Sequence, residues 1–114
     1  YLAVAPDGSV YPCHQFVGRP GFRLGSVKDG NFAFSPLAAR LRGLTVYAKA
    51  ACRECWAKFL CSGGCHANNH TLGGGLDRPW PLGCDLTRIR MEAALYLQAR
   101  LAELRPAGAA RPAS

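Results

Sequence analysis

The sequence lacks any run of about twenty apolar residues, so it predicts no membrane-spanning helix and no membrane partner. It also lacks the basic segment and short apolar segment of a secretory signal peptide, and it shows no internal repeat. The chain begins with Tyr1 rather than Met, directly in a strand-like stretch. We therefore interpret it as part of a longer protein.

Acidic residues are scarce: the chain has seven Asp and Glu but 14 Lys and Arg, which gives a net charge of +7. A basic balance can indicate nucleic-acid binding, but here the arginines are scattered and form no dense run. Converting the six cysteines to thiolates would remove most of the excess positive charge. We therefore expect no nucleic-acid partner.

The N-terminal part predicts a β-hairpin over residues 2–12. The Pro-Asp-Gly sequence at 6–8 supplies a preset φ, a side-chain acceptor and a residue that tolerates positive φ. Residues 16–27 are rich in glycine and predict loops. Within 31–43, Ser35 followed by proline has the pattern of a helix N-cap, which predicts a short capped helix.

The C-terminal part predicts a loop and then a long helix. Residues 66–83 contain three consecutive glycines and two prolines, which favour a loop. Asp85 is a candidate N-cap for an amphipathic helix over 86–104, and residues 105–114 have the composition of a disordered tail. Together these elements predict an α+β fold with one domain over 1–104. The apolar positions of the helix are 86, 89, 93, 97, 101 and 104.

The densest feature is CRECWAKFLCSGGCH at residues 52–66, which holds four of the six cysteines. Disulfides are one interpretation, with fifteen possible pairings. However, C-x-x-C would close a strained ring, and such cysteine density is typical of shorter secreted scaffolds. The six cysteines are Cys13, Cys52, Cys55, Cys61, Cys65 and Cys84.

Structural zinc is the main alternative to redox chemistry. All-cysteine zinc sites use two C-x2-4-C pairs separated by a dozen or more residues, whereas here the second pair follows Cys55 after only five. One zinc ion would leave two thiols without a role. A second ion would need His14, His66 or His70 as a ligand, and the interpretation is then a zinc-stabilised binding module.

An iron-sulfur cluster suits these spacings better, because a cubane is larger than one ion and a remote cysteine can supply its last corner. Gly63 and Gly64 lack Cβ atoms and allow backbone N–H groups to approach a cluster. The apolar side chains at 56, 59 and 60 can exclude water or pack in the core. Arg53 can offset cluster charge, whereas Arg88, Arg90 and Arg100 are expected on a solvated helix face.

A radical S-adenosylmethionine (SAM) motif is missing. Such enzymes hold their catalytic cluster with C-x3-C-x2-C, and Cys61-x3-Cys65 is followed by Asn68 at the third cysteine position. This chain is therefore not expected to generate a radical, or to act as an enzyme, by itself.

The order C52-x2-C55-x5-C61-x3-C65, a later Cys84, and Gly8-x4-Cys13 in "DGSVYPCH" resembles the SPASM domain. SPASM domains are the auxiliary-cluster domains of radical SAM enzymes that modify peptides and proteins. More narrowly, "CWAKFLCSGGCHANN" is similar to maturases of SCIFF peptides, which form thioether cross-links. Quinohemoprotein amine dehydrogenase maturases share much of this pattern.

The resemblance implies two [4Fe-4S] clusters with interleaved ligands. The second auxiliary cluster would take Cys52, Cys55, Cys61 and Cys84, so the thiol of Cys84 must lie near the other three. The first would take Cys13 and Cys65, with a further cysteine that lies before Tyr1.

The resemblance also implies the activity and partners of the parent enzyme. An N-terminal radical SAM domain would bind SAM and receive electrons from a donor such as ferredoxin or flavodoxin. The substrate would be a cysteine-containing precursor peptide, and the location cytoplasmic. The domain in this chain would supply electron transfer and placement of a substrate thiolate.

Overall fold

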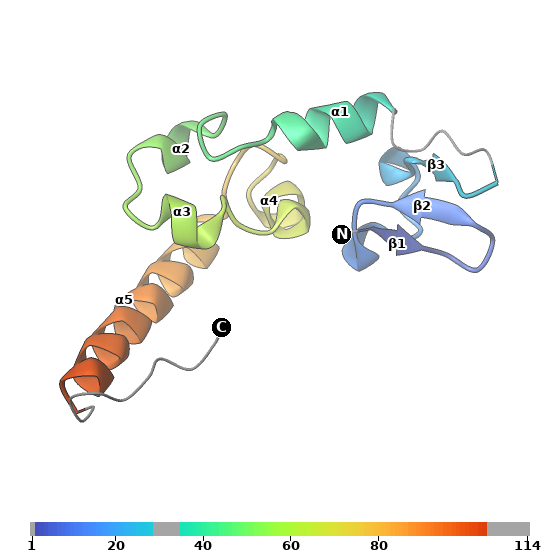
Figure 1. Cartoon of the computed structure of the whole chain (residues 1–114). Coiled ribbons are helices and arrows are strands. Elements are labelled where there is room, and N and C mark those ends of the chain that lie inside the picture. Colours follow the sequence, from blue (N-terminus) through green and yellow to red (C-terminus); the bar gives the residue numbers. More distant parts are fainter. Residues whose placement is uncertain (1, 29–34, 105–114) are drawn as a thin grey trace.

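The computed structural model describes residues 2–28 and 35–104. An N-terminal sheet lies at one end of the molecule, α1 connects it to a group of short helices, and α5 extends away from that group (Figure 1). The radius of gyration is 18.4 Å, whereas a compact domain of this length has about 13 Å. The chain is therefore elongated. No helix in its described parts is long and apolar enough to cross a membrane.

The predicted hairpin is present as β1 (Ala3–Val4) and β2 (Ser9–Tyr11), paired antiparallel with Val4 opposite Val10. Gly8 adopts φ +87° in the turn, which is why glycine follows the Pro-Asp pair. A third strand, β3 (Gly25–Ser26), pairs with the other side of β2, whereas the sequence predicted a loop there. Two-residue strands carry too little pattern to be recognised within a glycine-rich segment.

Two 3-10 helices connect β2 to β3: η1 (His14–Phe16) and η2 (Pro20–Phe22). The predicted capped helix is confirmed as α1 (Pro36–Gly43), where the Ser35 hydroxyl accepts a hydrogen bond from the Ala38 amide at 3.1 Å. The segment before Ser35 that the helix prediction included, 31–34, lies outside the described residues, as does the predicted tail 105–114.

The core lies between the sheet, α1 and α4. One buried cluster contains Val10, Leu24 and Ala38, so it joins the sheet to α1. A second buried cluster joins the N-terminal segment to residues that follow the cysteine motif: Tyr11, Phe16, Ala67 and Leu76. Phe16 also stacks on Phe22 with ring centroids 4.1 Å apart. These contacts fix the cysteine region relative to the sheet.

The cysteine region contains two short helices, α2 (Ala50–Arg53) and α3 (Lys58–Cys61). The predicted loop over 66–83 is wrong, because its first half forms α4 (His66–Leu72). The glycines that favoured a loop begin only at the end of α4, where the Gly73 amide closes the helix on the Asn69 carbonyl at 2.9 Å.

The long helix α5 (Pro81–Glu103) begins five residues earlier than predicted. Asp85 is inside the helix and is not its N-cap; Trp80 holds that position and Pro81 follows as the first helical residue. Proline is favoured there because its φ is preset and its missing N–H would be unpaired in any case. No described residue of α5 is buried, and the predicted apolar face is exposed, with Ile89 63 % and Leu97 57 % accessible.

Candidate metal centre

Four cysteines line one pocket, which we call the four-thiol pocket: Cys52, Cys55, Cys61 and Cys84. Cys55 lies in the turn between α2 and α3. Cys52 lies in α2, Cys61 ends α3, and Cys84 lies in the first turn of α5. Cys84 thus reaches the pocket from the N-terminal end of α5. The rest of its lining is formed by Ala51, Ala57, Lys58, Gly63, Pro79, Thr87 and Arg88.

All six cysteines are free thiols, so no disulfide competes for them. Cys52 is buried, and this burial raises its pKa, while the neighbouring Lys49 ammonium opposes the shift. Burial likewise raises the pKa of Cys84, against the opposing charge of Arg88. Without a bound cation the two thiols therefore favour the neutral form, and a bound metal would favour the thiolate.

The four thiols border one shared pocket. Within residues 2–28 and 35–104, no three His, Cys, Asp or Glu side chains converge closely enough to hold a single metal ion. A tetrahedral zinc site with Zn–S bonds of about 2.3 Å would place its sulfurs about 3.8 Å apart.

Cys65 and Cys13 lie apart from the four-thiol pocket. Cys65 is exposed at the start of α4 and lines an adjoining pocket together with Cys61 and Cys84. Its sulfur accepts a hydrogen bond from Gln15 Nε2 at 3.5 Å, which brings the segment after Cys13 close to it. Cys13 lines neither pocket and packs against the core cluster around Phe16.

None of the three histidines considered as zinc ligands lines the four-thiol pocket. His70 packs edge-on against Phe22, with centroids 4.7 Å apart. His66 has a buried Nε2 without a hydrogen-bond partner among the described residues, and burial lowers the pKa of its ring. The site is therefore a thiol site.

A polar network missed by the sequence analysis holds the loop between Cys61 and Cys65. Lys49 Nζ and Asn69 Nδ2 both donate to the Gly63 carbonyl, at 2.7 and 3.1 Å. Asn69 Oδ1 in turn accepts from the Trp80 amide at 3.2 Å. Since Trp80 caps α5, the network sets the position of Cys84 relative to the loop. One lysine and one asparagine form no recognisable motif in the sequence. Their role in this network is therefore visible only in the folded structure.

Positive φ values and close side-chain packing both favour glycine at positions 63 and 64. Gly63 and Gly64 have φ values of +82° and +75°, which favour glycine. A Cβ on Gly63 would lie 2.9 Å from Lys49 Nζ, and one on Gly64 would lie 3.3 Å from Asn69 Oδ1. The two glycines therefore leave room for the buried side chains of Lys49 and Asn69.

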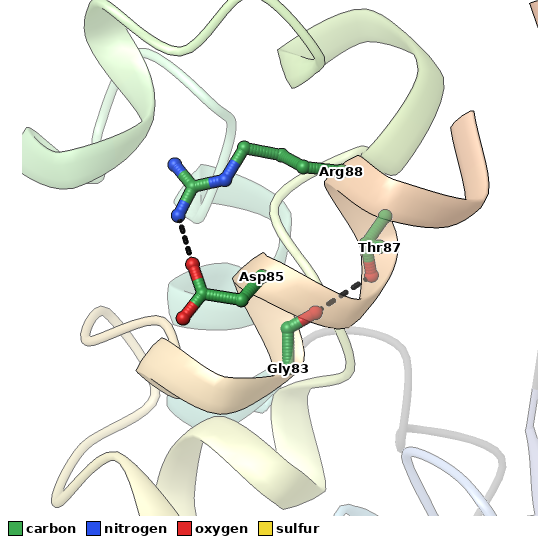
Figure 2. Close-up of polar contacts among 4 residues, drawn as sticks. All are labelled: Gly83, Asp85, Thr87 and Arg88. Atoms are coloured by element: carbon green, nitrogen blue, oxygen red, sulfur yellow. Dashed lines mark hydrogen bonds and ion pairs between the residues drawn. The ribbon is translucent and has the colours of Figure 1, made fainter. Parts of the chain in front are cut away.

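The first turns of α5 form one rim of the four-thiol pocket. Thr87 Oγ1 donates to the Gly83 carbonyl at 2.8 Å, and Arg88 pairs with Asp85 at 2.5 Å (Figure 2). The side chain of Arg88 is 41 % exposed, in agreement with the predicted solvated face, and it also lines the rim of the pocket. Arg100 pairs with Glu103 at the far end of α5 and is exposed, as predicted.

The large apolar side chains of the motif at positions 56, 59 and 60 are not core residues. Trp56, Phe59 and Leu60 are 50 %, 68 % and 55 % exposed. Phe59 packs edge-on against Tyr47, and Lys58 Nζ lies 5.4 Å from its ring centroid. Core packing is therefore excluded for these three side chains.

Comparison with known proteins supports a metal-cluster site. Residues 1–56 match the SPASM family, an iron-sulfur cluster-binding domain. The SPASM match contains Cys13, Cys52 and Cys55. The chain is also similar to a PqqA peptide cyclase from Methylocella silvestris, with 35 % identity over 91 residues and 75 % of this chain covered. It spans 24 % of the length of that relative.

Proposed function

We propose that this chain is an auxiliary iron-sulfur domain of a radical SAM enzyme that modifies a peptide. The observation that carries the proposal is the four-thiol pocket, where Cys84 joins the three cysteines of α2, α3 and the turn between them. The SPASM match supports iron-sulfur binding independently. Thiolates are the usual ligands of iron-sulfur clusters.

The donor set fits a [4Fe-4S] cluster better than zinc, the alternative. The thiols share a pocket, yet no three of the described ligands converge on one ion. A cubane spreads its four iron corners, so its ligands surround a space instead of a point. We propose that Cys52, Cys55, Cys61 and Cys84 hold the second auxiliary cluster. Such a group, when bound, exchanges single electrons and can ligate a thiolate.

The protein side chains around the pocket supply charge and shielding. No acidic residue lines it, whereas Lys58 and Arg88 do. These cations oppose the negative charge that four thiolates bring. Cys13 and Cys65 are proposed ligands of a first auxiliary cluster, completed by a cysteine before Tyr1. The hydrogen bond from Gln15 to Cys65 supports this, because it ties the segment after Cys13 to the second ligand.

The proposed reaction of the parent enzyme begins in a separate radical SAM domain. One electron from a ferredoxin or flavodoxin cleaves SAM to methionine and a 5′-deoxyadenosyl radical. The radical takes a hydrogen atom from a peptide carbon and becomes 5′-deoxyadenosine. A peptide thiolate then bonds to that carbon, and one electron is released. The electron that started the reaction is thus recovered, and a thioether cross-link has formed.

The substrate class is proposed from the similarity to the PqqA peptide cyclase. The PqqA peptide cyclase acts, by its name, on a peptide that it cyclises. A thioether cross-link also closes a ring in a peptide, so a SCIFF-type substrate with cysteines agrees with that name. SAM, a precursor peptide, the radical SAM domain and the electron donor are the proposed partners, and the proposed location is cytoplasmic.

The test is anaerobic reconstitution of the chain with iron and sulfide. We expect a brown protein with broad visible absorption and matched iron and sulfide. Cys55→Ala should remove the cluster of the four-thiol pocket, and Cys13→Ala, the control, should leave it largely intact. A colourless protein with stoichiometric zinc would contradict the proposal. Equal iron loss in both variants would contradict the division of ligands.

A further inference from the structure

Lys49 is a fully buried charged residue in the part of the chain that the structure describes. Its accessible fraction is 0 %, and the other large side chains buried to this degree, Phe16 and Val10, are apolar. Its ammonium donates to the Gly63 carbonyl at 2.7 Å. Within the described parts of the chain the ion pairs are Arg88–Asp85 and Arg100–Glu103. Lys49 therefore has no described carboxylate at ion-pair distance.

A buried ammonium needs a compensating negative charge. Removing a cation from water costs several kcal/mol unless opposite charge or hydrogen bonds replace the solvent. Burial accordingly lowers the pKa of Lys49 from 10.5, and the charges that oppose this shift are first those of the Cys52 and Cys61 thiolates, then Asp77 and Cys84. Three of these four groups line the four-thiol pocket.

The backbone places Lys49 directly behind the wall of that pocket. Gly63, whose carbonyl accepts from Nζ, is itself a lining residue. The missing Cβ of Gly63 leaves the space that Nζ occupies. Lys49 also directly precedes α2, which carries Cys52. The cation is thus held next to the thiols on the side away from solvent.

We propose that the ammonium of Lys49 is the buried countercharge of the group held by the four thiols and raises its reduction potential. This inference rests on the proposed function. Four thiolates on a [4Fe-4S]2+ core carry a net charge of −2, and one added electron makes it −3. A fixed positive charge in a poorly solvated wall stabilises the more negative state, because it attracts it more strongly.

The exposed cation Arg53 gives a matched comparison. Arg53 is adjacent to Cys52 in the sequence, but its side chain is exposed and its Nε donates to the Tyr47 carbonyl at 2.9 Å. Solvent and salt screen such a charge. The potential should therefore depend on the buried lysine and not on the arginine that is closer in sequence.

The experiment is a potentiometric titration, with dithionite as the electron source and EPR as the readout. A Cys13→Ala, Cys65→Ala background leaves the four-thiol pocket as the single cluster site. In it, Lys49→Met removes the charge and the donor, whereas Lys49→Gln removes the charge and keeps a donor for Gly63. Both should lower the ratio of reduced to oxidised cluster at least tenfold at a fixed potential, about 59 mV for one electron. Arg53→Gln, the control, should leave it unchanged.

Each of the following results contradicts the proposed role of Lys49. An unmoved potential in both Lys49 variants, with iron retained, overturns the inference alone. A shift in Lys49→Met without one in Lys49→Gln assigns the effect to the hydrogen bond and also overturns it. Loss of iron from both variants with an unchanged circular dichroism spectrum makes Lys49 a scaffold residue instead. Absence of iron and sulfide from the background protein overturns the proposed function, and this inference with it.

Discussion

The N-terminal region and the cysteine region are held together by different forces. In the N-terminal region, buried apolar side chains form two core clusters: Val10 packs with Leu24 and Ala38, and Tyr11 and Phe16 pack with Ala67 and Leu76. In the cysteine region, the buried side chains include a lysine, an asparagine and a thiol: Lys49, Asn69 and Cys52. The first region is organised by apolar burial, and the second by hydrogen bonds around a thiol pocket.

The difference shows where a bound group would contribute to folding. Apolar burial stabilises by roughly 25 cal/mol per Å² without any ligand. The cysteine region has little of it, and α5, which carries Cys84, has no buried described residue. Four metal–thiolate bonds would join α2, α3 and α5 directly. If the proposed cluster binds, we therefore expect the second region to depend on it and the first to be independent of it.

The largest expected effect is that of removing iron. Chelation of the reconstituted chain should greatly accelerate exchange of the Cys61 amide, which donates to the Ala57 carbonyl at 2.8 Å. The Leu24 amide, bonded to the Val10 carbonyl at 2.8 Å, should remain protected. Hydrogen exchange followed by NMR checks both. Equal acceleration at the two amides would show that the regions are not distinct.

A core truncation tests the first region. Phe16 is 1 % exposed and stacks on Phe22, so Phe16→Ala should lower the free energy of unfolding by about 3–5 kcal/mol. Phe59→Ala is the matched control, because Phe59 is 68 % exposed, and its effect should stay within about 0.5 kcal/mol. Denaturant unfolding of the reconstituted chain measures both. Similar effects of the two substitutions would refute the assigned core.

Two glycines with similar φ values separate backbone strain from close packing. Gly18→Ala, at φ +77° with no atom within 4 Å of the new Cβ, should cost about 1–2 kcal/mol. Gly63→Ala, at φ +82°, should cost more, because its Cβ would displace the buried Lys49 from the Gly63 carbonyl. Unfolding midpoints and iron content measure the two effects. A Gly63→Ala variant no worse than Gly18→Ala would mean that the lysine adapts easily.

The smallest expected effect is a pH dependence confined to the hairpin. The amide and hydroxyl of Ser9 both donate to the Asp7 carboxylate at 2.9 Å, and these bonds hold the pKa of Asp7 below 3.8. The carboxylate therefore stabilises the turn above pH 3.8, and the contribution is lost as the pH falls through the lowered pKa. The chemical shift of the Ser9 amide follows this titration, and Asp7→Asn removes it. Titration of Asp7 at 3.8 or higher would contradict the turn geometry.

Local signals in the sequence predicted the elements that depend on neighbouring residues. The Pro-Asp-Gly turn and the Ser35 cap each act within a few residues, so the hairpin and α1 are confirmed. The loop prediction over 66–83 is wrong because composition dominated it, while the residues of α4 gain their helical state partly by packing Ala67 into the core. Tertiary contacts override weak local preferences in short segments.

The spacing of the thiols indicated a cluster site, because a metal cluster is recognised by the type and separation of its ligands. The grouping of Cys52, Cys55, Cys61 and Cys84 came from the resemblance to SPASM domains, and the structure places these four cysteines at one pocket. What only the tertiary structure decided is the surroundings of those thiols: Lys49 behind Gly63, Asn69 bridging to Trp80, and a helix start that places Cys84 in the first turn of α5. These contacts join residues 11 to 14 positions apart through single side chains. A side chain that acts alone leaves no periodic or spaced pattern, so its partner is visible only after the chain has folded.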